Sequence, residues 1–482
     1  MMTRHKALSL LACCAVPFFA GCANLAPDYV QPPAPVAAQW PQELGVKTAA
    51  TLEAAAAPAV EWSDLLALQP LRDTVTLALQ NSRDLRLAVL AIEKARASYN
   101  IQDAATWPTL NGTASMSAAR TPGQASASGV SSTSRSYSVG VGTSAYEVDV
   151  FGRVRNLQEA ALQNFLSTEQ TQRSVQLSLV AEVATAWLTM AADRSLLTLA
   201  QDTLRSQQAT FDLVAKRQQL GADSSLTLAQ AQTSVDSARR DVAAYESQVR
   251  QDKYALELLV GTAVPERLLP TGSVDLASSA VVLGVPSGVP SAVLQRRPDV
   301  LAAEHVLKAS NADIGAARAA LFPRISLTSS VGTASRSLSN LFQGGAWSFV
   351  PSLTIPLLDG GASRAELRVA EVSRDIQVAT YEKAVQTAFT EVADALAVRA
   401  SLAERLAAQD SLVGAWQRSL TLSQARYQYG SYSYLNVLDA QRSLYTAQQA
   451  RISLQLADLV NRMTLFKALG GSWAAQEQST GE

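Results

Sequence analysis

The chain has 482 residues, well above the usual length of a single domain, so we expect more than one compact core. Its 40 Lys and Arg residues balance 41 Asp and Glu residues, so no net charge points toward nucleic acid or an acidic substrate, and we predict no nucleic-acid partner. With two histidines, and all three cysteines within the first 22 residues, the sequence offers no zinc cluster and no nucleophile–base–acid set, so we predict no enzyme, metal or cofactor.

The N-terminus has the pattern of an export signal. A basic start at residues 4–6 precedes an apolar run over residues 7–20, which is too short to span a membrane as a helix. The run ends in Phe-Ala-Gly before Cys22 and resembles the lipobox of bacterial lipoproteins. We predict a signal peptide over residues 1–21 and lipidation of Cys22; the alternative is an ordinary signal peptide with a chance cysteine. Ala23 is not the aspartate of the inner-membrane retention signal, which favours the outer membrane.

A segment rich in Pro and Ala follows the predicted lipid. We predict that residues 22–60 form an extended tether between the lipid and the body of the protein. No later segment offers 18 uninterrupted apolar residues, so the sequence predicts no transmembrane helix. Such a chain can cross a membrane only as a β-barrel.

The body of the chain has the pattern of an internal duplication. An Asn-Ser-Arg-Asp-Leu run at residues 81–85 is similar to Gln-Arg-Arg-Pro-Asp-Val at residues 295–300, and an aromatic–Pro pair also occurs in both halves. The predicted domains are a first repeat over residues 61–285, a second repeat over residues 286–473 and a tail over residues 474–482.

Each half predicts the same order of elements: a helical stretch, two alternating segments, then two long helical stretches joined by a turn with one glycine. The first helical stretches are residues 64–106 and 297–320, and the long ones are residues 155–220, 222–260, 364–429 and 431–469. Their apolar residues recur at spacings of three and four, as in helices that pack like coiled coils. About 66 residues at ~1.5 Å each give roughly 100 Å, which favours a rod or tube over an ordinary helical bundle.

The alternating segments predict β-strands. Residues 137–145 and 324–331 alternate apolar with small or polar side chains, and residues 109–117 and 347–357 do so less cleanly. One apolar face and one small polar face fit a membrane barrel with a wet lumen, or an amphipathic sheet on a soluble core. Two strands per repeat give four per chain, whereas a closed barrel needs about eight. Several copies must therefore share one barrel.

Four stretches resemble those of a known protein family. They are Tyr-Glu-Val-Asp-Val-Phe-Gly-Arg-Val-Arg at residues 146–155, Arg-Arg-Pro-Asp-Val through Asn-Ala-Asp-Ile-Gly to Phe-Pro at residues 296–323, Tyr-Leu-Asn-Val-Leu-Asp-Ala-Gln-Arg at residues 434–442, and Lys-Ala-Leu-Gly-Gly-Ser-Trp at residues 467–473. In order and spacing they resemble the outer-membrane factor family of the TolC superfamily, in particular its lipoproteins similar to OprM and NodT. The resemblance covers residues 62–473.

The resemblance implies an α+β membrane protein that is a homotrimer. Its 12-stranded β-barrel in the outer membrane would continue into a long 12-helix periplasmic α-barrel. The implied function is the outer-membrane channel of a tripartite efflux pump for drugs or other small toxic compounds. The implied partners are outer-membrane lipid, a periplasmic adaptor (a membrane fusion protein) and an inner-membrane transporter of the resistance-nodulation-division (RND) type. The sequence has no Walker A loop, so the chain does not supply the energy.

Two alternatives to drug efflux stay open. The same duct could serve type I protein secretion or metal-ion efflux. A structural coiled-coil lipoprotein without a channel would explain the helices but leaves the four alternating segments without a purpose.

The two predicted helix hairpins share the pattern Arg-x-x-x-Gly-x-x-Ser at their turns. The residues are Arg217, Gly221, Ser224, Arg426, Gly430 and Ser433. The resemblance implies that these turns dock the hairpin of the adaptor. A turn that merely joins two helices explains the glycines, which allow a left-handed backbone, but not the repeated Arg and Ser.

Leu435, Asp439 and Arg442 follow one another at i, i+4 and i+7, so they lie on one helical stripe. The resemblance implies a closed periplasmic gate: a ring of Leu435 side chains, with Asp439 and Arg442 in contacts between protomers and Tyr427 nearby. The alternative is a solvated pair on an outer face. Such a gate should open cheaply, because partly exposed ion pairs contribute only ~0–1 kcal/mol each.

Overall fold

The structure is a computed structural model that describes residues 24–37, 62–127, 129–271 and 291–471. The predicted signal peptide (1–21), Cys22, most of the tether and the tail (474–482) lie outside the described residues. Two compact units are present. The sheet unit contains residues 1–33, 91–169 and 302–382, and the hairpin unit contains residues 34–90, 170–301 and 383–482. Each unit therefore combines segments from both predicted repeats.

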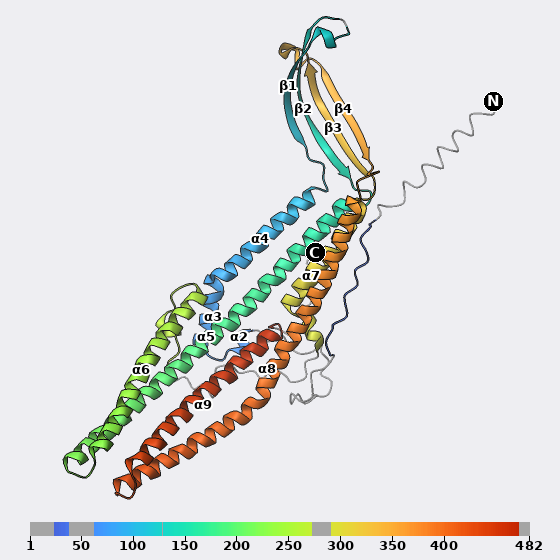
Figure 1. The fold of residues 1–482 in the computed structure, drawn as a ribbon. Coiled ribbons are helices and arrows are strands. Elements are labelled where there is room, and N and C mark those ends of the chain that lie inside the picture. The colour runs from blue at the N-terminus through green and yellow to red at the C-terminus, as the bar shows by residue number, and fades with distance from the viewer. Residues whose placement is uncertain (1–23, 38–61, 128, 272–290, 472–482) are drawn as a thin grey trace. The chain divides into compact units, whose positions relative to one another are not determined.

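From α4 and from α7 onward, the same order of one helix, two strands and two long helices occurs twice along the chain (Figure 1). The first run is α2 (Trp62–Leu65), α3 (Gln69–Asn81), α4 (Arg83–Ala104), β1 (Asn111–Thr121), β2 (Ser132–Val148), α5 (Arg153–Gln219) and α6 (Ser225–Val260). The second run is α7 (Pro298–Ala319), β3 (Arg324–Ser335), β4 (Gly345–Thr354), α8 (Ala362–Gln428) and α9 (Tyr434–Ala468). Both α4 and α7 have 22 residues, and both α5 and α8 have 67.

The long helices match the predicted stretches to within a few residues, but the predicted helix over residues 64–106 was wrong as one element. It is divided into α2, α3 and α4. Leu68 is extended and Pro70 stands in the first turn of α3, where a proline starts a helix but cannot continue one. Ser82, with ψ 132°, then leaves helical geometry between α3 and α4.

The four strands form one antiparallel sheet in the order β1-β2-β3-β4, as Figure 1 shows. Cross-strand partners share a face, and one row holds Val141, Val331 and Trp347, whose side chain is 80% exposed. On the other face, hydroxyls pair across the strands, for example Ser330 with Ser348 at 2.8 Å. The predicted alternation is therefore real, and β2 and β3 extend beyond the predicted segments.

Glycine is required where the strands approach one another on the small polar face. Gly332 pairs with Gly140 of β2, and a Cβ atom added at Gly332 would lie 2.1 Å from the backbone oxygen of Val139. One added at Gly142 would lie 2.3 Å from the backbone oxygen of Ser329. Interior glycines commonly mark such a close approach of two backbones.

The core of the hairpin unit surrounds the middle of α5. Trp187 is buried there and its indole N–H donates to the carbonyl oxygen of Leu268 at 2.8 Å. Among the described residues, α5 is the one helix long and apolar enough to cross a membrane, with a best window of mean hydropathy 1.4. Because 56% of that window is buried inside the protein, the apolar character is that of a core helix.

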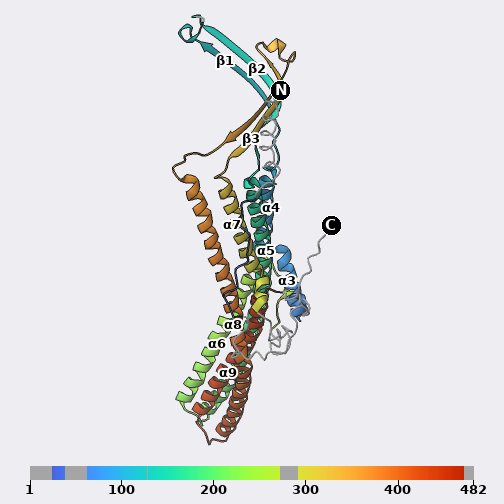
Figure 2. The same cartoon turned by 90° about the vertical axis from the view of Figure 1, so that its right-hand side faces the viewer.

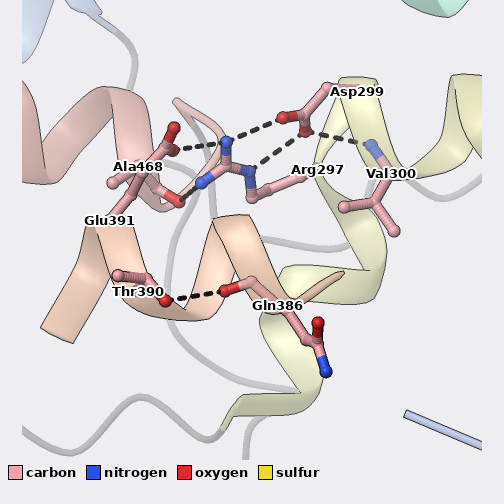
Figure 3. Close-up of polar contacts among 7 residues, drawn as sticks. All are labelled: Arg297, Asp299, Val300, Gln386, Thr390, Glu391 and Ala468. Atoms are coloured by element: carbon pink, nitrogen blue, oxygen red, sulfur yellow. Dashed lines mark hydrogen bonds and ion pairs between the residues drawn. The ribbon is translucent and has the colours of Figure 1, made fainter. Parts of the chain in front are cut away.

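Arg297 joins three helices of the hairpin unit (Figure 3). Its guanidinium pairs with Asp299 of α7 and Glu391 of α8, each at 2.7 Å, and donates to the carbonyl oxygen of Ala468 of α9 at 2.7 Å. The side chain is 6% exposed. The Arg-Pro-Asp motif therefore has a structural role that the planar, forked guanidinium is shaped to fill.

We expect Arg297→Lys to lower the free energy of unfolding by about 1–3 kcal/mol, because a single ammonium group leaves polar partners unsatisfied. The measurement is thermal unfolding of the purified protein followed by circular dichroism. Arg296→Lys is the matched control, since the neighbouring Arg296 is exposed. An equal loss of Tm in both variants would contradict the role of Arg297.

Candidate gate and docking site

The two hairpin turns have the same backbone geometry, and both lie at the same end of the helix hairpins (Figure 2). In residues 217–222 and 426–431, the last N–H donates to the first carbonyl at 2.8 and 3.0 Å. Gly221 has φ 77° and Gly430 has φ 74°, in the left-handed region. The left-handed backbone predicted for both glycines is confirmed, and the closing hydrogen bond is that of a Schellman-type helix end.

The repeated serines start the helices that follow the turns. The Ser224 side chain accepts a hydrogen bond from the backbone N–H of Thr227 at 3.1 Å and so caps α6. Ser433 has the same position before α9, but its side chain makes no cap; it accepts from the Asn436 side chain at 3.4 Å. Helix capping therefore explains the serine of the first hairpin but not the serine of the second.

Asp223, which sequence reasoning missed, links the two hairpins. Its Oδ2 accepts from Arg217 Nε at 2.8 Å and from the Tyr427 hydroxyl at 2.7 Å. The Arg217 guanidinium also lies 5.0 Å from the centre of the Tyr427 ring. Burial, followed by the hydrogen bond to Asp223, raises the pKa of Tyr427 above its ordinary value, so the phenol remains a donor. The link therefore joins α5 and the first turn to α8.

An apolar cluster supports this link. Its buried members are Val214, Ala231, Tyr427, Tyr434, Val437 and Leu438. The rings of Tyr427 and Tyr434 have centroids 5.6 Å apart. Tyr427 is 7% exposed, so the structure places this predicted gate residue between the hairpins.

The other three predicted gate residues share one exposed face of α9. Leu435 is 59% exposed, and Asp439 and Arg442 are exposed as well. Within the part of the chain that the structure describes, Asp439 and Arg442 form no ion pair with each other or with another side chain. An apolar side chain and two opposite charges are therefore available to a partner.

The turns also expose large apolar side chains that the sequence pattern had not singled out. Leu220 is 84% exposed and Tyr429, which has the equivalent position in the second hairpin, is 89% exposed. Arg426 lies 5.1 Å from the ring of Tyr432. Exposed aromatic and aliphatic groups beside arginine are typical of protein interfaces. The signal was present in the sequence as an apolar residue directly before each glycine.

Two carboxyl groups meet within the first hairpin. Asp193 of α5 and Asp252 of α6 share a hydrogen bond, and burial followed by this neighbour raises the pKa of Asp193 to about 7. Gln248 donates to Oδ1 of Asp252 at 2.9 Å. The neighbouring cations have other partners: Arg194 donates to the Pro270 carbonyl oxygen and Lys253 pairs with Glu266. The Asp193 carboxyl therefore keeps its proton to near neutral pH.

We expect the raised pKa of Asp193 to make the protein lose stability as the pH rises from about 4 to 8. The folded state binds more protons than the unfolded state between the ordinary pKa of Asp193 and its raised value, so ionisation disfavours folding. Asp193→Asn should flatten this dependence. The measurement is the Tm at a series of pH values, with Asp202→Asn, at an exposed carboxylate paired with Arg205, as the control. A wild-type slope that survives in Asp193→Asn would contradict the assignment.

Comparison with known proteins gives one family. Residues 74–262 and 289–471 match the outer membrane efflux protein family. The solvent efflux pump outer membrane protein SrpC of Pseudomonas putida is 45% identical over 474 residues, covering 96% of this chain and 99% of SrpC. The cation efflux system protein CusC of Escherichia coli is 39% identical over 467 residues, covering 96% of this chain and 98% of CusC.

A solved structure has the same fold. The open state of the Neisseria gonorrhoeae MtrE outer membrane channel is 36% identical and superposes with a TM-score of 0.82. The match covers 94% of this chain and 99% of the MtrE chain.

Proposed function

Since this chain belongs to the outer membrane efflux protein family, we propose that three copies of it assemble into one export duct. The chain is the outer-membrane channel component of an efflux pump. β1 and β4 are the edges of its sheet, and open edges cannot lie in lipid because their backbone groups need partners. Three chains supply twelve strands, enough to close a β-barrel, and their long helices continue it as a 12-helix periplasmic barrel.

The equal lengths of α4 and α7, and of α5 and α8, support an internal duplication. We assign residues 61–285 to the first copy and residues 286–473 to the second. The shared closure of the two turns supports the same assignment.

We propose that Cys22 becomes the first residue after removal of residues 1–21 and carries the acyl chains that anchor the protein. Each buried methylene group contributes about 0.8 kcal/mol to such an anchor. The intact mass of the mature protein tests this: a mass without acyl chains would contradict the proposal.

The cargo that we propose is small toxic organic compounds, including drugs. The observation that carries this proposal is the similarity to SrpC, which is named for solvent efflux, over nearly the whole of both chains. Metal-ion efflux is the second candidate, because CusC is named for cation efflux and is similar over the same length.

The test is a deletion strain complemented with the wild-type gene or an empty vector. Survival is compared on a series of organic solvents and antibiotics and on copper and silver salts. Restored tolerance to the organic compounds alone supports the first proposal. Restored tolerance to the metals alone would replace it with the second.

We propose that the hairpin turns dock the periplasmic adaptor, which connects the duct to an inner-membrane transporter of the RND type. The exposed Leu220 and Tyr429 would supply apolar contact area, and Arg426, stacked on Tyr432, would supply a charge at the rim. Arg217 would act indirectly, because its side chain is already held by Asp223.

We propose that the exposed face of α9 closes the periplasmic end of the duct. In a threefold assembly each Leu435 would meet its copies, and Asp439 and Arg442 would find the charged partners that they lack among the described residues. The buried link from Asp223 to Tyr427 would then hold the two hairpins together at rest.

A further inference from the structure

Residues 24–31, here called the strap, lie along one stripe of α7 in the sheet unit. The stripe consists of Glu304, Lys308, Asn311, Gly315 and Arg318. Their spacing is i, i+4, i+7, i+11 and i+14, so the five residues lie on one side of the helix. In Figure 1 the strap belongs to the dark-blue segment beside α7 and α8.

The backbone of the strap is bound by side chains of the stripe. Arg318 Nη1 donates to the carbonyl oxygen of Leu25 at 3.2 Å. Asn311 Nδ2 donates to the carbonyl oxygen of Pro27 at 2.7 Å. These contacts capture the strap in an extended conformation that runs antiparallel to α7.

Side chains of the strap complete the binding. The Tyr29 hydroxyl donates to Glu304 Oε1 at 3.2 Å, and Lys308 Nζ lies 5.2 Å from the centre of the Tyr29 ring. Gln31 donates to the Tyr381 hydroxyl of α8 at 3.1 Å. Charge-assisted and aromatic contacts therefore fix the second half of the strap.

Gly315 shows that the fit is close. A Cβ atom added there would lie 2.8 Å from the Cβ of Ala26 and 2.6 Å from Asn156 Nδ2. Asn156 in turn donates to Asn24 Oδ1 at 2.9 Å. A glycine inside a helix costs about 1 kcal/mol relative to Ala, and here it makes room for the strap.

The lengths of the two partners agree. From Arg318 back to Lys308, α7 rises about 15 Å at ~1.5 Å per residue. From Leu25 to Tyr29, an extended chain covers about 13 Å at ~3.3 Å per residue. The strap and the stripe therefore match in length from Leu25 to Tyr29.

We propose that the α7 stripe is a docking site for the strap and that it fixes the lipid-bearing end of the chain in one register. If residues 22–60 were a flexible tether, the lipid would lie at a variable distance from the body of the protein, with an average end-to-end distance of roughly 35 Å. The docked strap instead ties Asn24 to Asn156 in the first turn of α5, and Cys22 is only two residues, at most ~7 Å of backbone, further on. The predicted tether therefore begins with a bound segment. The consequence for the lipid rests on the proposed acylation of Cys22.

Docking is tested with a spin label at the exposed Asp28, introduced as Asp28→Cys in the mature, acylated chain. We expect an immobilised spectrum in the otherwise wild-type protein and a mobile one in Gly315→Leu. Gly414→Leu is the matched control, because a Cβ atom there meets only Arg418, at 3.6 Å. A mobile label in the wild-type background would overturn docking.

Two further variants keep the test independent of folding and of the lipid. Asn311→Ala combined with Arg318→Ala removes the donors without adding bulk and should also free the label. Cys22→Ala, exported on a cleavable signal peptide that lacks cysteine, should leave the label immobilised, because the stripe and not the lipid holds the strap. A label that is free only without the lipid would overturn the docking site while leaving the proposed lipidation intact.

The register is tested by insertion. Four residues (Gly-Ser-Gly-Ser) inserted between Ala23 and Asn24 should lower the amount of trimer in the outer membrane, because they separate the lipid from the strap. The same insertion after Val36, beyond the strap, should have no effect. Equal effects of the two insertions would overturn the fixed register.

Discussion

The double variant Asp439→Ala, Arg442→Ala turns a small, noisy channel into a large and steady one. This is the expected result in a planar lipid bilayer, where single-channel conductance of the purified protein is compared with wild type. Both side chains are exposed on α9 and form no ion pair among the described residues, so between protomers they are available for the ion pairs that close the duct. Removing them leaves only the Leu435 contacts and the buried hairpin link.

A matched control separates the gate from a general loss of surface charge. Asp202 and Arg205 form an exposed ion pair at the same spacing on α5, outside the proposed gate. Asp202→Ala, Arg205→Ala should conduct like wild type. If wild type and the gate variant conduct equally, the proposal of a duct is supported but the gate lies elsewhere. If neither conducts, the barrel itself is contradicted.

Gly332→Val should abolish the channel altogether. The added Cβ would lie 2.1 Å from the backbone oxygen of Val139, and a backbone atom cannot move aside as a flexible side chain can. β2 and β3 would have to separate, and lost strand pairing is costly in lipid, where no water replaces the hydrogen bonds. The measurement is the amount of trimer in the outer membrane, read by gel mobility with and without heating.

Gly112→Val is the control for the sheet. Gly112 lies in β1, and a Cβ atom added there meets nothing within 4 Å. This variant should insert and conduct normally. Normal insertion of Gly332→Val would show that the strands of the membrane-inserted sheet lie further apart than in the structure.

The regular elements could be predicted from sequence because each depends on local periodicity. The stretch at residues 155–220 has no Gly or Pro, and it forms α5 to within two residues at either end. The break between α3 and α4 was missed because Ser82 interrupts the helix without a proline or glycine to mark it, whereas Pro70 did mark the start of α3.

The candidate site was also predictable only where its residues depend on local sequence. Leu435, Asp439 and Arg442 were predictable as one face because a single helix carries them. The role of Asp223 was not, because its partner Tyr427 is 204 residues away in the other repeat. Arg297 also acts across helices, and its contact with Ala468 spans 171 residues.

The small polar face of the sheet has a consequence for the whole pump. Glu147 and Arg324 pair with each other near its helix end, and the central rows of the described strands carry Ser, Thr, Gly and Ala, as in Ser115, Ser138 and Ser330. In the proposed barrel this face lines the lumen. These central rows of hydroxyls and bare backbone have no charge with which to tell an organic molecule from a cation. The duct would therefore be a passive, interchangeable part, and the choice of cargo would be made by the transporter before anything reaches it.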